Sequence, residues 1–426
     1  MPSRAPDSPA QAFPAPLAEP ERIRSLDILR GVAVLGIFAM NIRDFALPIQ
    51  EFDNAAFPTP PLRASDLWAW GLTNLLFEDK MIAIFSILFG AGILTMAARS
   101  PRPTLIHYRR MFWLFLIGLA HAFGLWYGDI LNTYAICGAI IFPLRRLRPA
   151  LLIALGVALL TSAVWFRVAP AMSASLSPPA PQAQSAPHPE SASDRIWRES
   201  LRDEHAAYRG SWLDLARWRA RLNIVWHWYG CISFNFERCA GFMLIGMGLI
   251  QLGILSASRP APFYASLLIA AYALGALLVA LGMWPQLLRA LGHVPDASPE
   301  ARRILASAAW SLRSTAAGFI AIGHIALVML LCRARAFSTL LHPLAAAGRM
   351  ALSNYLLQTL IAVALFDPWA GHQWGAWRMT QLYTLVPAVW LAQLILSPIW
   401  LRFFRFGPAE WLWRSLTYWR PQPFRA

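Results

Sequence analysis

The sequence predicts an all-α protein: a polytopic transmembrane bundle of about ten helices, with the N- and C-termini in the cytoplasm. The chain of 426 residues is 57% hydrophobic and only 14% charged, and its mean hydropathy of +0.46 is far from that of a soluble domain. Apolar segments long enough to cross a bilayer recur along the whole chain. Arginines collect in alternate connections between these segments.

Each apolar segment has roughly the 20 residues that a helix needs to cross the hydrocarbon core. In chain order the expected spans are 29–47, 81–98, 110–127, 130–144, 149–168, 230–254, 262–284, 306–332, 345–366 and 380–403. The fourth segment is short, and the sixth contains Glu237 and Arg238. These two segments are therefore the candidates for broken or re-entrant helices.

The excess of basic residues gives a formal net charge of +15, which in a soluble protein would suggest nucleic-acid binding. Here the arginines gather before the first span and after the second, fourth, eighth and tenth. Short connections rich in Arg stay in the cytoplasm, according to the positive-inside rule. The charge therefore predicts a membrane topology, with the lipid bilayer as partner and no nucleic acid.

The composition also divides the chain into five parts. Residues 1–22 are rich in Pro and Ala and lack the apolar core of a signal peptide, so we expect a disordered cytoplasmic tail. Residues 23–170 and 224–404 form the N- and C-terminal parts of the membrane bundle. Between them, 171–223 is expected to be an extracytoplasmic linker followed by an amphipathic helix. Residues 405–426 form a cytoplasmic C-terminal segment.

The amphipathic helix is predicted from apolar and aromatic residues that recur at spacings of three or four. These residues are Trp197, Leu201, His205, Tyr208, Trp212 and Leu215. Such a helix can lie on the outer membrane surface over the mouth of the bundle, or it can pack on other loops.

Polar residues inside three outward-running spans are the candidates for a functional site, because burying them in a membrane is costly. By depth along each helix, they run from the cytoplasmic side outward. They are Arg30 and Asn41 in the first span; Arg109, Arg110, His121 and Asp129 in the third; and Arg349, Asn354, Tyr355 and Gln358 in the ninth. If these spans are neighbours, their side chains form one polar ladder from face to face.

His121 is the candidate general base, because a neutral imidazole can accept a proton from a hydroxyl group. Asp129, about two helical turns further on, can orient the ring or balance its charge. The alternative is a histidine that only hydrogen-bonds a neighbouring helix. Lys80 is the only lysine in the chain and is also a candidate, although an interfacial ion pair with Glu78 or Asp79 explains it as well.

Arg30 and Arg349, together with Arg109 and Arg110, can form a cytoplasmic cluster that binds phosphate groups, since guanidinium groups bind phosphate bidentately. Asp27 is expected to pair with one of them. The alternative is that these arginines only set the topology. The four cysteines are scattered without metal-ligand spacing, so neither a metal site nor a permanently bound cofactor is expected.

Five segments resemble the YeiB-like family of bacterial multi-pass inner-membrane proteins, whose domain is one of unknown function. The segments are Arg24–Ile37, Lys80–Gly90, Arg109–Leu131, Gly348–Gln358 and Phe406–Tyr418. That family is similar to a wider group of transmembrane acyltransferases, which includes bacterial O-acyltransferases of envelope sugars and the lysosomal heparan glucosaminide acetyltransferase.

The resemblance implies transfer of an acyl group from cytosolic acyl-CoA to an extracytoplasmic acceptor, which can be an envelope glycan, a lipid or a small molecule. In the bacterial O-acyltransferases an Arg of the first span is followed eleven residues later by His. Here Asn41 stands at that distance from Arg30, so His121 becomes the expected base. Asn41 or Gln358 would then donate a hydrogen bond to the oxyanion.

The predicted catalytic residues are therefore His121, Asp129 and Asn41. The predicted substrate-binding residues are Arg30, Asp27, Lys80, Arg349, Asn354, Tyr355 and Gln358. Two other functions stay open. The same polar residues can form a transporter or channel for a proton or a small polar solute, or the protein can be a structural subunit without activity.

Overall fold

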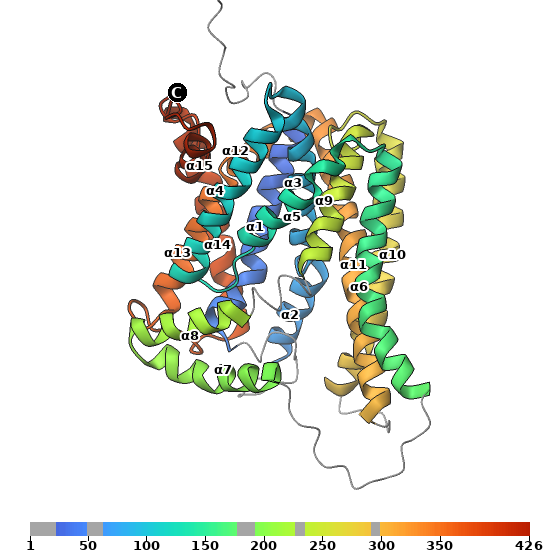
Figure 1. The fold of residues 1–426 in the computed structure, drawn as a ribbon, viewed down its shortest axis with the longest axis vertical. Coiled ribbons are helices and arrows are strands. Elements are labelled where there is room, and N and C mark those ends of the chain that lie inside the picture. Colours follow the sequence, from blue (N-terminus) through green and yellow to red (C-terminus); the bar gives the residue numbers. More distant parts are fainter. Residues whose placement is uncertain (1–22, 49–62, 177–191, 226–234, 291–298) are drawn as a thin grey trace, which may run out of the picture.

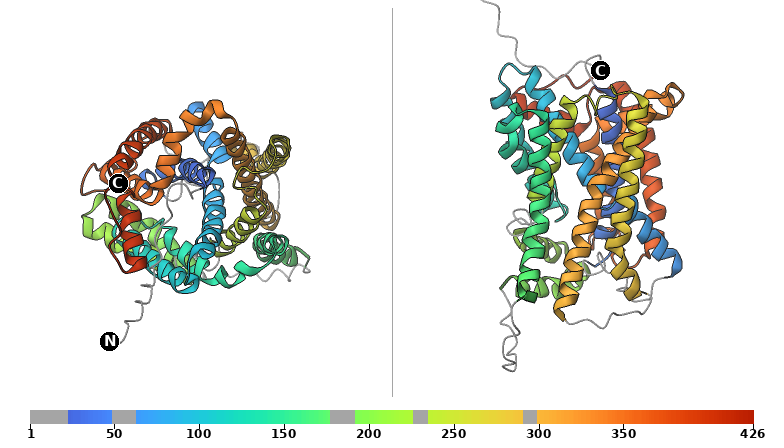
Figure 2. Two further views of the ribbon diagram at one scale, coloured as in Figure 1. Left: turned by 90° about the horizontal axis from the view of Figure 1, so that it is seen from above. Right: turned by 90° about the vertical axis from the view of Figure 1, so that its right-hand side faces the viewer.

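The computed structural model describes residues 23–48, 63–176, 192–225, 235–290 and 299–426. Every regular element within these ranges is a helix, and most of the long helices run side by side in one bundle (Figure 1, Figure 2). The all-α class is therefore confirmed. The tail at 1–22 and the low-complexity run at 178–187 lie outside the described residues.

The structure describes fifteen α-helices in chain order. They are α1 (Arg24–Ala46), α2 (Ala64–Leu76), α3 (Lys80–Arg99), α4 (Pro103–Gly124), α5 (Leu131–Ile141), α6 (Pro149–Leu176), α7 (Ala192–Arg209), α8 (Trp212–Val225), α9 (Phe236–Gln251), α10 (Ala261–Ala290), α11 (Pro299–Arg333), α12 (Ser338–Arg349), α13 (Ala351–Phe366), α14 (Met379–Phe403) and α15 (Pro408–Tyr418).

Within the described residues, five helical stretches are long and apolar enough to cross a membrane, and a sixth is added if α12 and α13 count as one span. The five are Arg24–Ala46, Ala64–Arg99, Ala261–Trp284, Ser311–Arg333 and Met379–Phe403. The protein is thus a multi-pass membrane protein. A total of about ten spans stays a prediction, because α5 and α9 have only 11 and 16 residues.

The ninth expected span is broken into two helices. The sequence predicts broken helices only at the fourth and sixth spans. Instead of one helix over 345–366, the chain forms α12 and α13, bent by 78°. The bend is at Met350, whose backbone leaves the helical region. Next to the bend, α12 packs closely against α1: a Cβ atom at Gly348 would overlap the carbonyl oxygen of Asp27.

The amphipathic segment also forms two helices rather than one. Helices α7 and α8 are separated at Gly210 and Ser211, and the Asp214 carboxylate accepts hydrogen bonds from the backbone and hydroxyl of Ser211, at 3.0 and 2.7 Å. Both helices lie across one end of the bundle (Figure 1). Tyr208 and Leu215 of the predicted apolar face are buried, whereas Trp212 is exposed.

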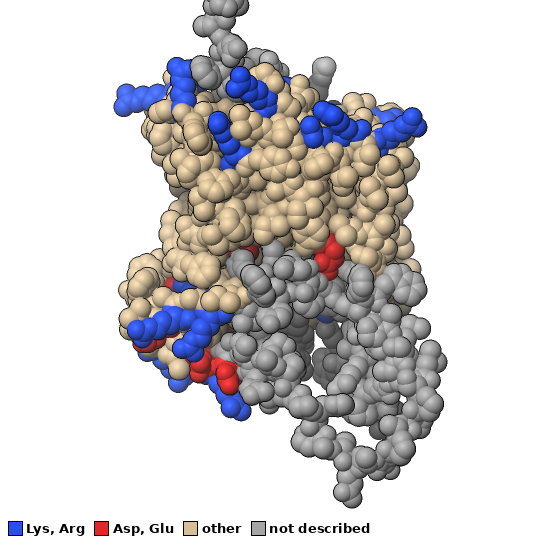
Figure 3. Space-filling model, viewed as in Figure 1, with Lys and Arg blue, Asp and Glu red and all other residues tan. Residues whose placement is uncertain are grey.

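The other end of the bundle carries α15, the C-terminus and the arginine-rich connections, and we refer to it as the basic end. Arginines line this rim in Figure 3, above a band with few charged side chains. The positive-inside rule predicts that the basic end faces the cytoplasm and that the end covered by α7 and α8 faces outward.

Candidate functional site

A cavity of about 310 Å³ enters the bundle at the basic end, between α1, α3, α4, α13 and α15. Its charged lining side chains are Asp27, Arg30, Arg99, Arg110, Arg349, Glu410 and Arg414. Further in, the wall is apolar and includes Phe85, Leu88, Met111 and Leu114. We call it the arginine-lined cavity. Since Arg99 and Phe85 both lie on α3, it extends roughly 20 Å along that helix, at ~1.5 Å per residue.

Helix α15 forms one wall of the cavity and is attached to two other helices. The Glu410 carboxylate accepts hydrogen bonds from the backbone N–H groups of Leu352 and Ser353, at 2.7 and 3.2 Å. These N–H groups are in the first turn of α13, where no helical carbonyl can accept from them. On the other side, the Trp413 indole N–H donates to the Arg110 carbonyl of α4 at 3.0 Å. Glu410 therefore stabilises the break between α12 and α13.

Burial raises the pKa of Glu410, although hydrogen bonds from Ser353 and Leu352 oppose the change. A raised pKa in the folded state means that Glu410 contributes most stability below the usual carboxyl pKa of about 4.3, and that this contribution is lost as pH rises through the folded value. We expect Glu410→Gln to remove this dependence.

The measurement is thermal unfolding of both proteins in detergent across a pH series. The stability advantage of the wild type over the variant should shrink as pH rises. Glu199→Gln changes an exposed residue of α7 and serves as the control. Parallel curves for wild type and Glu410→Gln would contradict the assignment.

Beyond the deep end of the cavity lies a buried polar cluster of His121, Asp129 and Thr359. Nδ1 of His121 is 2.9 Å from a carboxylate oxygen of Asp129, and Nε2 is 3.0 Å from the Thr359 hydroxyl. The other Asp129 oxygen accepts the backbone N–H of Asn132 at 3.0 Å. In the tautomer in which Nδ1 donates to the Asp129 carboxylate, Nε2 is the acceptor of the ring.

Tyr355 separates this cluster from the cavity. Its side chain lines the cavity, and its ring centroid is 5.1 Å from that of His121. His121, Asp129 and Thr359 do not line the cavity themselves. The Tyr355 ring therefore borders both the cavity and the imidazole.

The predicted contact between His121 and Asp129 is present, and its catalytic role stays a prediction. Thr359 was missed by the sequence analysis. The only signal for it was a hydroxyl residue next to Gln358 in an otherwise apolar stretch.

The predicted ladder is not one passage, because the two amide residues of α13 face elsewhere. Gln358 donates to the Val34 carbonyl of α1 at 3.0 Å and to the Gln393 side chain of α14 at 2.9 Å. Asn354 donates to the Ala347 carbonyl, at 3.1 Å. These buried amides join helices, as polar side chains commonly do in membranes. Asn41 is half-buried on α1 and does not line the cavity either.

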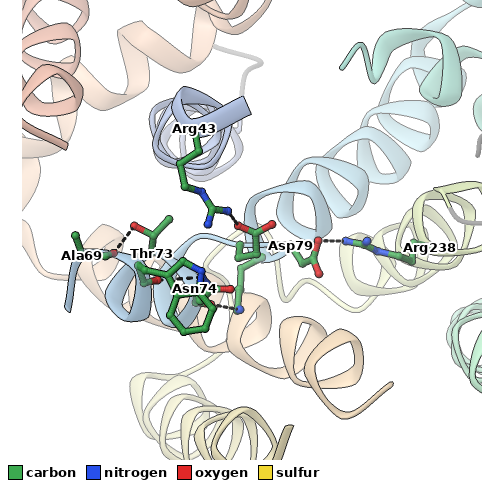
Figure 4. Close-up of polar contacts among 9 residues, drawn as sticks. Arg43, Ala69, Thr73, Asn74, Asp79 and Arg238 are labelled. Atoms are coloured by element: carbon green, nitrogen blue, oxygen red, sulfur yellow. Dashed lines mark hydrogen bonds and ion pairs between the residues drawn. The ribbon is translucent and has the colours of Figure 1, made fainter. Parts of the chain in front are cut away.

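Lys80 is the first residue of α3 and belongs to a separate group of charges, of which Arg43, Asp79 and Arg238 are labelled in Figure 4. Its buried ammonium group donates to the Asn74 carbonyl at 2.5 Å. The ion pair expected for Lys80 stays a prediction: Glu78 and Asp79 attract its charge, but arginines of other helices pair directly with both carboxylates. Glu78 pairs with Arg43 of α1 at 2.5 Å, and Asp79 pairs with Arg238 of α9 at 2.6 Å. Asp79 has a φ of 64°, which places it at a sharp turn before α3.

The predicted arginine cluster is found in part. Arg30 pairs with Asp27 at 2.6 Å, as expected, and both line the cavity together with Arg349 and Arg110. Arg109 is elsewhere: its guanidinium group lies 4.3 Å from the centre of the Trp419 ring. Arg99 and Arg414, which follow the second and tenth predicted spans, also line the cavity.

The fold and the cavity define a class: an all-α integral membrane protein with an arginine-lined cavity open at its basic end. A family model described as "Protein of unknown function (DUF418)" matches residues 249–420. The chain belongs to the YeiB family, since it is 32% identical to "Uncharacterized protein YeiB" of Escherichia coli (strain K12), over 93% of this chain and 96% of that protein.

A second relative confirms that the similarity spans the whole bundle. "Uncharacterized protein YxaH" of Bacillus subtilis (strain 168) is 28% identical over 94% of this chain and 96% of its own length.

Proposed function

We propose that the protein is a transmembrane acyltransferase of the bacterial inner membrane, which takes an acyl group from cytosolic acyl-CoA and transfers it to an extracytoplasmic acceptor. One observation carries the proposal: an arginine-lined cavity at the cytoplasmic end stops at Tyr355, and the ring of Tyr355 contacts a histidine that is paired with a carboxylate.

The cavity suits a donor with a phosphorylated head and a long uncharged arm. Its five arginines offer planar guanidinium groups, which bind phosphate oxygens bidentately. The apolar wall beyond them accepts an uncharged chain, and its depth of roughly 20 Å at ~1.5 Å per helical residue suits an extended pantetheine arm. The thioester would then end close to Tyr355.

His121 supplies the base in this scheme. Its Nε2 atom accepts the proton of an acceptor hydroxyl, which takes the place that the Thr359 hydroxyl now occupies. The acceptor oxygen attacks the thioester carbonyl, the C–S bond breaks, and the proton passes from His121 to the leaving CoA thiolate. Asp129 stabilises the imidazolium that exists in between.

Tyr355 must turn aside for this reaction, because it lies between the cavity and the histidine. Its hydroxyl is also better placed to donate to the oxyanion than the predicted Gln358, which is already engaged with α1 and α14. The acceptor would enter from the end that α7 and α8 cover, and an envelope glycan, a lipid or a small molecule fits this requirement.

The test is turnover of labelled acyl-CoA by proteoliposomes of the purified protein, with envelope extract as the source of acceptors. We expect transfer, with a rate that His121→Gln lowers by a factor of about 10² to 10⁴. The double variant Arg349→Ala and Arg414→Ala should instead raise KM for the donor. Comparative mass spectrometry of envelope lipids and glycans, with and without the protein, would identify the product.

A transporter or channel is the competing function. The described polar groups form separate clusters rather than one continuous passage, which favours the enzyme. Flux of a proton or a small solute across the proteoliposome membrane, without acyl turnover, would overturn the proposal. Absence of both activities would favour a structural subunit.

A further inference from the structure

A second hollow lies on the outer surface of the bundle, between α4 and the C-terminal segment at the basic end. It has a volume of about 330 Å³ and is open to the surroundings. The residues that line it are Trp113, Ser415, Leu416, Trp419, Arg420 and Pro421. We propose that this groove binds one anionic phospholipid of the cytoplasmic leaflet. The proposal does not depend on the acyltransferase activity.

The apolar character of the groove is the first argument. Two indole rings, a leucine and a proline make up most of its lining. Trp419 is 69% exposed and is held outward by a left-handed backbone conformation, with a φ of 54°. Tryptophan is enriched at the level of lipid head groups, where its amphipathic ring bridges water and hydrocarbon.

The surface of α4 gives the acyl chain a path that continues from the groove. Exposed apolar and aromatic side chains recur on this helix at spacings of three or four, and therefore lie on one face. They are Leu105, Tyr108, Phe112 and Leu116. Trp113, which lines the groove, lies next to Phe112 in the same helix, with ring centroids 5.4 Å apart. A lipid chain can pack along this face into the bilayer.

The charges at the groove select an anionic head group. The guanidinium group of Arg109 stacks on Trp419, and Arg420 extends from the rim as an exposed side chain. Among the residues that the structure describes, neither arginine forms an ion pair with an acidic side chain. Both lie at the basic end, which faces the leaflet that is rich in anionic lipids.

Occupancy would also affect the arginine-lined cavity, since α15 borders both. Leu416 of α15 lines the groove, and Arg414, Thr417 and Tyr418 line the cavity. A bound lipid would therefore hold the helix that forms one wall of the cavity.

The test uses the full-length protein in mixed micelles with phosphatidylglycerol or phosphatidylcholine, and counts retained lipids by native mass spectrometry. We expect the wild type to retain phosphatidylglycerol preferentially. Arg420→Gln should reduce this preference about fivefold, which corresponds to ~1 kcal/mol per basic residue near the surface, and adding Arg109→Gln should reduce it again by a similar factor. Arg425→Gln, an exposed arginine outside the groove, is the matched control.

Equal retention of the two lipids by the wild type would overturn the proposal. An unchanged preference in the double variant, or an equal loss in Arg425→Gln, would overturn it too, since the charge effect would then not arise at the groove. Trp419→Ala adds an independent check that does not alter charge. It should lower retention of both lipids, and full retention would also count against the groove as the site.

Discussion

Replacement of His121 by glutamine is expected to lower kcat for acyl transfer by a factor of about 10² to 10⁴, which is the usual contribution of a positioned base. KM for acyl-CoA should hardly change, because His121 does not line the arginine-lined cavity. Glutamine keeps a side chain of similar size that can hydrogen-bond Thr359. The measurement is steady-state kinetics in proteoliposomes at a fixed acceptor concentration.

His324→Gln is a matched control for that variant. His324 of α11 is also bonded at both ring nitrogens, to the Tyr272 hydroxyl at 2.8 Å and to the Leu76 carbonyl at 2.9 Å, but it lies outside the cavity and the His121 cluster. The His324→Gln variant should retain acyl transfer. Comparable losses in the two variants would mean that His121 acts only as a structural hydrogen-bonding group.

Arg219→Leu is expected to destabilise the protein by about 3 to 5 kcal/mol, the cost of leaving one member of a buried ion pair without its partner. Arg219 of α8 donates two hydrogen bonds to the Asp367 carboxylate, at 2.8 and 2.7 Å. It also donates to the Leu125 carbonyl at the end of α4, at 2.7 Å. The two side chains are only 5% and 2% exposed, so water cannot replace these contacts.

An exposed ion pair between α8 and α7 provides the control for the buried pair. Arg221 and Asp203 are 3.4 Å apart, with side chains 69% and 54% exposed, and exposed pairs contribute at most about 1 kcal/mol. Arg221→Leu should therefore unfold close to the wild-type midpoint in a denaturant or thermal titration in detergent. Arg219→Leu should unfold at a clearly lower midpoint. Similar shifts in both variants would show that the buried pair does not hold α8 on the bundle.

The same contacts connect α8 to the helix that carries His121. Asn223 donates to the Ala122 carbonyl at 2.7 Å, one residue after the histidine, and Arg219 donates to Leu125 three residues later. Helix α8 thus holds the end of α4 in place, and an acceptor that enters from this side must pass it.

Some features of the site were accessible from the sequence because they are local. His121 and Asp129 are only eight residues apart. His121 lies at the end of α4 and Asp129 in the connection that follows, so the short stretch of chain between them keeps them close. Asp27 and Arg30 face the same side of α1 for the same reason, since residues three apart are neighbours on a helix.

Other features depend on which helices become neighbours. Tyr355 and Gln358 are both polar and buried in α13, yet one lines the cavity and the other bonds α1 and α14. The bend before α13 lies between the close contact of Gly348 with α1 and the hydrogen bond from Leu352 to Glu410 of α15, 58 residues further along the chain. No pattern near Met350 indicates either contact.

By itself, the sequence determined that this protein is helical and embedded in a membrane, and it predicts which end faces the cytoplasm. Those properties depend on hydrophobicity and charge summed over segments, and each segment contributes independently of the others. Only the tertiary structure decided that the arginines share one cavity, that Thr359 joins His121, and that the amides of α13 bond other helices. Such contacts between distant residues depend on how the helices pack and rotate, which hydropathy along the chain does not specify.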